Sequence, residues 1–468
     1  MNVIWITSDT FRRDHIGAYG NKQIRTPSLD NLAAKSIRFE KHYAAGFPTM
    51  PARADHFTGR WTMSFMGWSP LSPELTTLAE FLSEKGIHTA AVVDTPFYLR
   101  GGMNYDRGFN SFFMNIGQEG SGAKKLKDGR HESQDIRAAW HYESDYNAPQ
   151  TFIKAMQWLE RHYKENFFLY IDTWDPHEPW DAPAYYTELY WPGYDGEIIE
   201  PIYGRWKDVP GFTENRLKKA HATYCGEITM IDAWLGHFLM RAENMGLMDK
   251  TAIIFTSDHG FYFGEHDGLF GKMVYEMGPD GNYPALEDWD KQSEGGIWSY
   301  SPLFEEIIRI PMLIYHPDLS PGIYDQLSSA VDVMPTVLEI LGYAPPSYVD
   351  GQSLLSKISD LSPRGRQFVV SSIPFANPGD PVRSVDNFLR MLKVSTVTTI
   401  TAGNFSLLYS PDEGMSKLFD LSVDPQQNHD IIASRREVAG ELHQLLVEFM
   451  KDTNVAEHLL NPRLELRI

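Results

Sequence analysis

Two stretches decide the fold, Val3-Ile4-Trp5-Ile6-Thr7-Ser8-Asp9 and Ile253-Ile254-Phe255-Thr256-Ser257-Asp258-His259-Gly260. Each is an apolar run that ends in polar residues, which is typical of a strand buried on both faces. Similar runs occupy residues 89–93, 167–171 and 311–315. Helix-like segments alternate with these runs, at residues 29–35, 78–85, 152–162, 216–245 and 333–341. The alternation predicts an α/β fold, with helices on both faces of the sheet.

The pattern changes after about residue 363. Residues 388–394 and 405–409 are short strand-like runs, and residues 436–451 form an amphipathic terminal helix. A chain of 468 residues is also too long for one small core. We therefore expect a catalytic domain at residues 1–365. A smaller α+β domain, with short antiparallel strands and a terminal helix, should follow at residues 366–468.

Composition narrows the classes of partner. The formal net charge of −20 argues against nucleic acid and anionic membranes as partners. The single cysteine, Cys225, excludes an intramolecular disulfide and a cysteine-rich zinc site, and its helical context predicts a buried structural thiol. The chain has no apolar run long enough to span a bilayer, and its start lacks the features of a signal peptide. We expect a cytoplasmic protein.

Candidate metal ligands follow two of the predicted strands. Asp9 follows the first, and Asp258 and His259 follow the strand at residues 252–256. Ligands of α/β sheets bind beyond the carboxyl ends of the strands. Mixed carboxylate and imidazole ligands suit Mn²⁺, Fe²⁺ or Zn²⁺ better than Mg²⁺. Asp9 taken alone is better explained as a helix cap, because Asp is common at that position.

A candidate nucleophile lies in Phe47-Pro48-Thr49-Met50-Pro51-Ala52-Arg53. Pro48 suits the first position of a helix, which places Thr49 near the positive end of the helix dipole. Arg53 lies four residues on, on the same helical face, where its guanidinium would hold an oxyanion. The alternative, which the local sequence alone favours, is a threonine N-cap with a surface arginine.

Five blocks of sequence, in order, resemble the sulfatases of the alkaline phosphatase superfamily. They are Asp9 to Gly20 with Thr26-Pro27-Ser28-Leu29-Asp30; Thr49-Met50-Pro51-Ala52-Arg53 with Thr58-Gly59-Arg60; Ser257-Asp258-His259-Gly260 with Gly264-Glu265-His266 and Gly271-Lys272; Asp332-Val333-Met334-Pro335-Thr336 with Asp350-Gly351-Gln352-Ser353-Leu354; and Leu418-Phe419-Asp420-Leu421 with Asp424-Pro425. Together they span nearly the whole chain. The resemblance implies an alkaline-phosphatase-like core, with a mixed, mostly parallel sheet and a small C-terminal domain.

The resemblance also implies roles for individual residues. Asp9, Asp258 and His259 would bind the metal, and Thr49 would be both nucleophile and metal ligand. Arg53, His177 and Lys272 would supply positive charge and hydrogen bonds. His177 lies in Asp175-Pro176-His177-Glu178-Pro179-Trp180, which suits a group that contacts the substrate or protonates its leaving group, although it could be an ordinary turn residue. The expected substrate-binding residues are Asp94, Thr95 and His266.

Several departures from the arylsulfatase pattern indicate a different chemistry. Thr10 replaces the second Asp of an Asp-Asp pair, and His259 replaces a common Asn. The Gly-Lys-Trp-His-Leu-Gly block is absent, and Val93-Asp94-Thr95-Pro96 stands in that region. These changes resemble phosphonate monoester hydrolases and phosphodiesterases. They favour Mn²⁺, with Zn²⁺, Fe²⁺ or Ca²⁺ as alternatives. We expect one metal ion, because the usual Asp-x-x-x-His of a second site is not evident near His177.

Thr49 is the largest departure. Sulfatases convert a Cys or Ser at this position to formylglycine, and Thr is not a known precursor. Threonine can attack phosphorus and form a phosphothreonine, as in nucleotide phosphodiesterases of the superfamily. The sequence therefore predicts a hydrolase of phosphodiesters or phosphonate monoesters, without formylglycine, acting on a small anionic ester. One alternative is a sulfatase that uses Thr49 directly or in which Thr49 replaces a native Cys. Another is a non-catalytic binding protein. The resemblance also makes a homo-oligomer reasonable.

Two polar segments, residues 117–146 and 277–300, interrupt the periodic pattern. Long loops of this kind are either functional lids or plain surface excursions. Residues 277–300 follow Lys272 closely, so we expect them to rim the pocket and to set the leaving-group preference.

Overall fold

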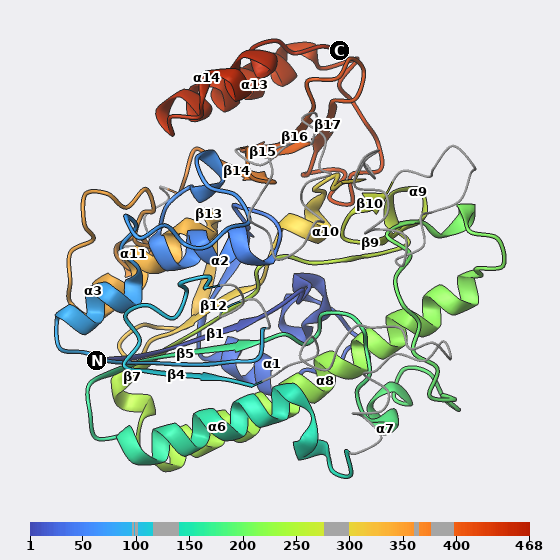
Figure 1. The fold of residues 1–468 in the computed structure, drawn as a ribbon. Coiled ribbons are helices and arrows are strands. Elements are labelled where there is room, and N and C mark those ends of the chain that lie inside the picture. Colours follow the sequence, from blue (N-terminus) through green and yellow to red (C-terminus); the bar gives the residue numbers. More distant parts are fainter. Residues whose placement is uncertain (96–97, 99–101, 116–139, 276–298, 360–364, 376–396) are drawn as a thin grey trace.

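The computed structural model describes residues 1–95, 98, 102–115, 140–275, 299–359, 365–375 and 397–468 (Figure 1). Its centre is an eight-stranded sheet in the order β13-β2-β12-β7-β1-β5-β3-β4. The strands are β1 (Asn2–Ser8), β2 (Ile37–Tyr43), β3 (His88–Val93), β4 (Ser111–Met114), β5 (Phe167–Thr173), β7 (Thr251–Thr256), β12 (Met312–Tyr315) and β13 (Gly322–Ser329). Only β12 runs antiparallel to its neighbours. The mixed, mostly parallel sheet confirms the predicted fold class.

Helices cover both faces of this sheet, as Figure 1 shows. Along β1, Val3 and Trp5 pack into one core, whereas Ile4 and Ile6 pack into the other, because successive side chains of a strand point to opposite faces. The first core contains residues of α2 (Thr49–Thr58), α3 (Leu78–Glu84) and α11 (Val333–Ile340). The second contains residues of α1 (Pro27–Ala34), α6 (Asn147–His162) and α8 (Glu214–Asn244).

All five predicted strands and all five predicted helices of the large domain are present, with ends shifted by a few residues. β2, β4 and β13 are strands that the pattern of apolar runs does not predict. β2 reads Ile-Arg-Phe-Glu-Lys-His-Tyr, in which apolar residues alternate with half-buried polar ones. β13 and β4 are the two edge strands, and both expose part of their surface. A search for continuous apolar runs misses such strands.

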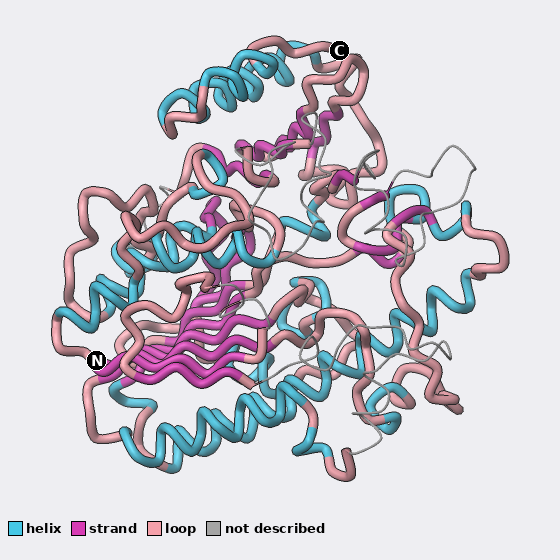
Figure 2. Tube along the Cα trace, viewed as in Figure 1, coloured by secondary structure: helices cyan, strands magenta, loops and turns pink. Residues whose placement is uncertain are grey.

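A separate antiparallel sheet follows in the C-terminal region, in the order β14-β15-β16-β17. Figure 2 shows it apart from the large sheet. Its strands are β14 (Phe368–Ser372), β15 (Thr398–Ala402), β16 (Phe405–Tyr409) and β17 (Lys417–Asp420). α13 (Arg436–Asp452), the predicted terminal helix, packs on this sheet through Leu446 and Phe449. The strand-like run at residues 388–394 lies outside the described residues, and the domain boundary near residue 365 stays a prediction.

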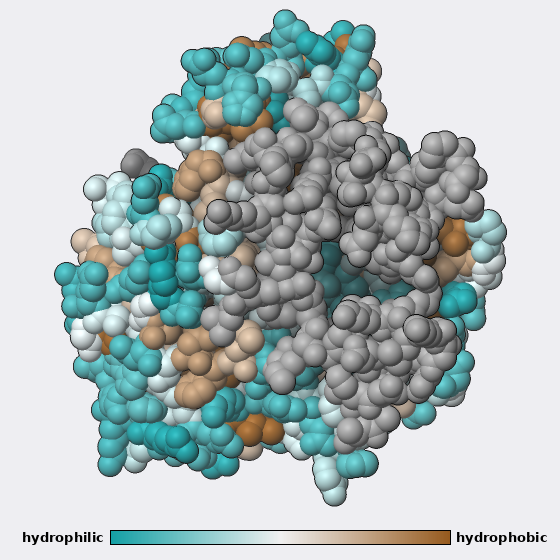
Figure 3. Space-filling model, viewed as in Figure 1, coloured by the Kyte–Doolittle hydropathy of each residue, from teal (hydrophilic) through white to brown (hydrophobic). Residues whose placement is uncertain are grey.

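The remaining described α-helices and strands are short. They are α7 (Ala184–Thr187), α9 (Glu265–Gly268), α10 (Glu305–Ile308), α12 (Leu355–Ser359), α14 (Glu457–Leu460), β6 (Gly204–Arg205), β8 (Tyr262–Phe263), β9 (Leu269–Gly271), β10 (Val274–Tyr275) and β11 (Ser299–Tyr300). The segment at residues 277–300 lies outside the described residues except for β11, and residues 117–146 are described only from residue 140. Hydrophilic residues cover most of the described surface visible in Figure 3. No described helix is long and apolar enough to cross a membrane.

Candidate active site

The three predicted metal ligands meet at the carboxyl ends of two neighbouring strands. Asp9 follows β1, and Asp258 and His259 follow β7; these strands pair in parallel with Thr7 opposite Thr256. The ligand atoms of the three residues all lie within 4.8 Å of one another, and all three side chains are fully buried. Asp9 is not a helix cap, because the next helical turn begins at Arg13 and has Arg12 at its N-cap.

His259 is held in the form that binds a metal. Its Nδ1 lies 3.0 Å from the carbonyl oxygen of Gly260, so Nδ1 carries the proton and donates it. Its Nε2 has no hydrogen-bond partner among the described residues and lies 3.5 Å from Asp258 Oδ2. Burial lowers the pKa of His259 to about 4, which keeps the ring neutral. A buried lone pair facing a carboxylate fits a metal ligand with a fixed tautomer.

The charges around the three ligands also fit a divalent cation. Among the described residues, four buried carboxylates are linked by ion pairs to two buried cations. They are Asp9, Asp172, Glu178 and Asp258, with Arg53 and Lys272 as the cations. Burial, with repulsion from Asp258, raises the pKa of Asp9 well above its usual value. A cation with two positive charges would balance this excess of two negative charges.

Thr49 begins α2 and lies beside this group. Pro48 is the N-cap, one position earlier than the first helical position predicted for it. Nη1 of Arg53 lies 3.2 Å from the carbonyl oxygen of Thr49, 2.6 Å from Asp258 Oδ2 and 2.9 Å from Asp9 Oδ2. Arg53 therefore joins the first turn of α2 to the predicted metal ligands. Because Arg53 is fully buried, the alternative of a surface arginine is wrong.

Asp172, in β5, is a site residue that was not predicted from the sequence. Its carboxylate accepts hydrogen bonds from Nε and Nη2 of Arg53, both at 2.8 Å. It also accepts hydrogen bonds from Thr95 Oγ1 at 2.9 Å, from Tyr170 Oη at 2.7 Å and from Tyr98 Oη. The bidentate pair fixes the plane of the guanidinium. An aspartate inside the apolar run Phe-Phe-Leu-Tyr-Ile-Asp-Thr was the signal that could have found it.

His177 and Lys272 form a second polar group. Lys272 Nζ and His177 Nε2 share a hydrogen bond, and Nδ1 of His177 lies 2.7 Å from the carbonyl oxygen of Glu178. The ring of His177 stacks on Trp174 at 3.7 Å. Burial, and then the charge of Lys272, lower the pKa of His177 well below its usual value. His177 is therefore neutral, and its Nε2 accepts a hydrogen bond from the Lys272 ammonium.

The predicted substrate-binding residues lie in different surroundings. Asp94 accepts hydrogen bonds from the backbone of Trp174 and from Thr151, which fixes the segment that carries His177. Thr95 donates to Asp172 and so belongs to the Arg53 network.

His266 is not brought into this network. Its described side-chain contacts include Glu306, whose Oε2 lies 2.8 Å from Nε2, and a stack on Phe304 at 3.6 Å. It lines a cavity of 350 Å³ together with Lys417 and Phe419 of β17. Its predicted contact with the substrate stays a prediction.

The chain matches a protein-family model and is similar to known proteins. The Sulfatase family model matches residues 1–343. The arylsulfatase of Clostridium perfringens (strain 13 / Type A) is 25% identical, over 96% of this chain and 94% of that protein. The phosphonate monoester hydrolase of Agrobacterium radiobacter has a similar structure, with a TM-score of 0.73, 21% identity, and coverage of 97% of this chain and 96% of that one.

A second solved structure is similar, with a TM-score of 0.72 and 19% identity over 97% of this chain and 98% of that one. It was solved with its substrate, D-glucosamine-2-N,6-O-disulfate. These structural likenesses agree with the alkaline-phosphatase-like fold. Because the family model covers well over half of the 468 residues, the chain belongs to the sulfatase family.

Proposed function

We propose that this protein is a metal-dependent hydrolase of phosphodiesters or phosphonate monoesters, and that Thr49 is its nucleophile. The observation that carries the proposal is a threonine at the start of α2, next to a buried arginine that also contacts Asp9 and Asp258. Oxidation of a threonine side chain at its hydroxyl carbon gives a methyl ketone, so Thr49 cannot become the formylglycine aldehyde. The ion pairs of Arg53 with Asp9, Asp172 and Asp258 are all present, which argues against loss of function.

One divalent metal ion, with Mn²⁺ as our first choice, would be held by Asp9, Asp258, His259 and the hydroxyl of Thr49. When bound, it would lower the pKa of that hydroxyl and polarise the ester. The chain supplies the other charges. Arg53 Nη1 reaches both carboxylates and the first turn of α2, so an ester oxygen at Thr49 would come within its range. Asp172 holds the guanidinium in position for that contact.

In the first step, the hydroxyl of Thr49 loses its proton to solvent and Oγ1 forms a bond to phosphorus. The bond between phosphorus and the leaving-group oxygen breaks. Lys272 donates a proton to that oxygen, because the neutral His177 has no second proton on Nε2 to give. His177 acts as a positioning residue for Lys272 through their hydrogen bond.

In the second step, water attacks the phosphothreonine and returns a proton to Lys272. The bond between Thr49 Oγ1 and phosphorus breaks, and Oγ1 takes up a proton from solvent. The ester is thus hydrolysed with one water consumed and no net change in the enzyme. Two displacements at phosphorus, one after the other, define a ping-pong mechanism.

The second candidate is a sulfatase, which the matched family model and the arylsulfatase from Clostridium perfringens favour. It requires Thr49 either to attack sulfur directly or to stand where the natural enzyme has a cysteine. A non-catalytic binding protein is the third candidate, and it predicts no turnover of any ester while metal is bound.

The test compares kcat/KM for four aryl esters: a phosphodiester, a phosphonate monoester, a phosphomonoester and a sulfate monoester. The proposal expects the first two to lead and Thr49→Ala to abolish both activities. Thr49→Ser should retain activity, since it keeps the hydroxyl. A clear preference for the sulfate ester would overturn the proposal. A large gain of sulfatase activity in Thr49→Cys, produced together with a formylglycine-generating enzyme, would instead support the second candidate.

A further inference from the structure

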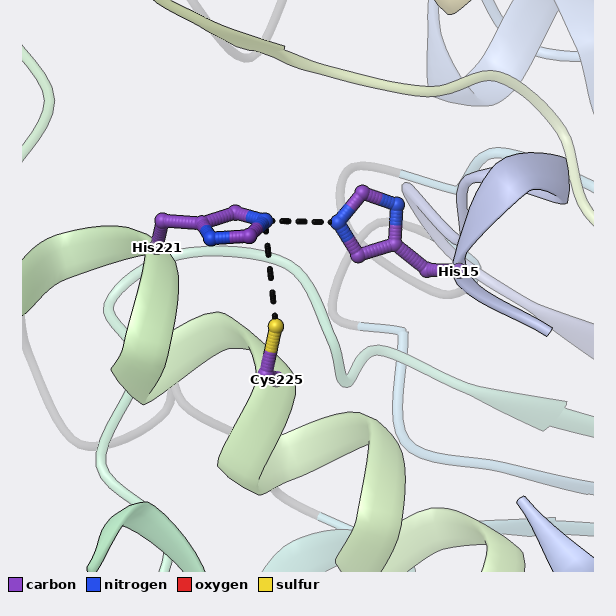
Figure 4. Close-up of side chains that lie close together, drawn as sticks. All are labelled: His15, His221 and Cys225. Atoms are coloured by element: carbon purple, nitrogen blue, oxygen red, sulfur yellow. Dashed lines mark hydrogen bonds between the residues drawn. The ribbon is translucent and has the colours of Figure 1, made fainter. Parts of the chain in front are cut away.

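A cluster of two imidazoles and one thiol lies on α8 and on the segment that follows Asp9. His15 Nε2 lies 2.7 Å from His221 Nε2, and His221 Nε2 lies 3.8 Å from Cys225 Sγ. Figure 4 shows the rings of His15 and His221 pointing toward each other, with the sulfur on one side of that contact. The three ligand atoms all lie within 4.8 Å of one another. None of these residues has a part in the proposed reaction.

The spacing fits a tetrahedral metal ion after a small adjustment. Metal–nitrogen bonds of about 2.05 Å and metal–sulfur bonds of about 2.3 Å give separations of about 3.3 Å between nitrogens and about 3.6 Å between nitrogen and sulfur. The distance from His221 Nε2 to Cys225 Sγ, 3.8 Å, is already close to this value, and the distance from His15 Nε2 to Cys225 Sγ is at most 4.8 Å. The two nitrogens would move apart by roughly 0.6 Å, which small rotations of two rings provide. His221 and Cys225 are four residues apart on α8 and so face the same side.

The surroundings orient the ligands. Asp14 Oδ1 lies 2.8 Å from His15 Nδ1, which leaves His15 Nε2 directed toward the cluster. A carboxylate on the far nitrogen of a histidine is the usual partner of a metal-binding imidazole. Two nearby cations are each paired with carboxylates: Arg12 with Asp14 and Glu265 at 2.6 Å each, and Lys218 with Glu214 at 2.7 Å. Burial lowers the pKa of His221 to about 3, so its ring is neutral. The hydrogen bond between the two Nε2 atoms holds one proton, which a metal ion would displace on binding.

The cluster also opens onto space for a fourth ligand. A cavity of 280 Å³ is lined by all three residues, together with Asn21, Tyr190 and Lys218. This volume holds a water molecule that could complete a tetrahedron. Burial raises the pKa of the Cys225 thiol to about 12, so a metal ion must displace its proton on binding.

We propose that His15, His221 and Cys225 form a second metal site, for Zn²⁺ or a similar soft divalent cation, with water from the cavity as the fourth ligand. The site would tie α8 to the segment that carries the first candidate ligand of the active site. Tyr224, the residue before Cys225, already donates to the carbonyl oxygen of Thr10 and accepts from the backbone of Arg12. The site is independent of the proposed function, because it needs neither Thr49 nor the ester.

Cobalt provides the test, because a thiolate–cobalt bond has a charge-transfer absorption in the near ultraviolet. Cys225 is the only cysteine of the chain, so this absorption can arise only there. Co²⁺ titrated into the metal-free, full-length protein should produce the band with a stoichiometry of one. Zn²⁺ should then displace it. The double variant Asp9→Asn/Asp258→Asn, which removes two candidate ligands of the active site, should keep the band.

Three variants test the ligands one by one. Cys225→Ser should abolish the band, and His15→Ala and His221→Ala should each weaken Co²⁺ binding. Asp14→Asn should weaken it about 10- to 100-fold, the usual effect of removing such a partner carboxylate. A second readout, which uses the native cysteine, is the rate of thiol modification. Zn²⁺ should protect Cys225 in the parent protein, but not in the double variant His15→Ala/His221→Ala.

Two outcomes would overturn the proposal. One is cobalt bound to the parent protein with no thiolate band. The other is a band or Zn²⁺ protection that persists after both histidines are removed.

Discussion

Asp172→Asn is the substitution whose effects follow most directly from the structure. The carboxylate accepts five hydrogen bonds, two of them from the guanidinium of Arg53. The asparagine has the same shape, but one of its two groups donates instead of accepting and it carries no charge. Whichever way the amide turns, an N–H faces a donor of Arg53. The change therefore breaks a buried ion pair and leaves the guanidinium only partly held.

Removing one partner of a buried ion pair costs about 3–5 kcal/mol of unfolding free energy. We expect a loss of this size for Asp172→Asn in urea unfolding. We also expect kcat/KM to fall about 10²- to 10³-fold under conditions where the protein remains folded, since Arg53 no longer faces the ester correctly. Both measurements are made on the metal-loaded protein.

Asp94→Asn is the matched control. Asp94 is equally buried, but its hydrogen-bond donors are the Trp174 backbone and the Thr151 hydroxyl, which carry no charge. Burial raises the pKa of Asp94 to about 7, so it is already partly neutral at neutral pH. We expect a loss of only about 1 kcal/mol. Equal losses of stability in the two variants, or an unchanged kcat/KM in Asp172→Asn, would refute the reasoning.

Three further predictions concern the metal, the leaving group and pH. Removal of metal by a chelator should abolish turnover, and Asp9→Asn should do so even with Mn²⁺ in excess, measured by activity and metal analysis; full activity in either case contradicts the ligand set. Lys272→Ala should slow an alkyl ester about 10²- to 10⁴-fold and a nitrophenyl ester much less, as expected for loss of a proton donor; equal losses for both esters would exclude that role. Burial lowers the pKa of His56 from 6.5 to about 3, so the unfolded chain binds more protons and stability is lost as pH falls below 6.5. In acid unfolding between pH 6.5 and about 3, the free energy of unfolding of His56→Leu should fall by about 1.4 kcal/mol less per pH unit than that of the parent protein. Parallel curves of unfolding free energy against pH for the two proteins would contradict this.

The strands that build the site could be predicted because they are buried on both faces. Continuous apolar runs such as β1 and β7 can be recognised as buried strands from the sequence alone. The polar residues that follow these two strands lie at one edge of the sheet, because the strands pair in parallel. β2 was not predicted, because its polar residues alternate with apolar ones and it contains no continuous apolar run.

Pairings between distant residues could not be predicted from the sequence. Arg53 and Asp172 are 119 residues apart, and His15 and His221 are 206 residues apart. Each residue taken alone has an ordinary local explanation, as a helical arginine, a strand residue or a surface histidine. Only the packing of β5 beside β1, and of α8 against the segment after β1, brings these side chains together.

The most direct test of the central claim is an acid quench of the enzyme during turnover of an aryl phosphonate monoester, followed by mass spectrometry of its peptides. The proposed mechanism predicts that the peptide containing Thr49 gains the mass of the phosphonyl group, and that the modified residue is Thr49 itself. The same peptide should stay unmodified in Thr49→Ala, which should also lack activity. Steady turnover with an unmodified Thr49 peptide at every quench time would contradict the account.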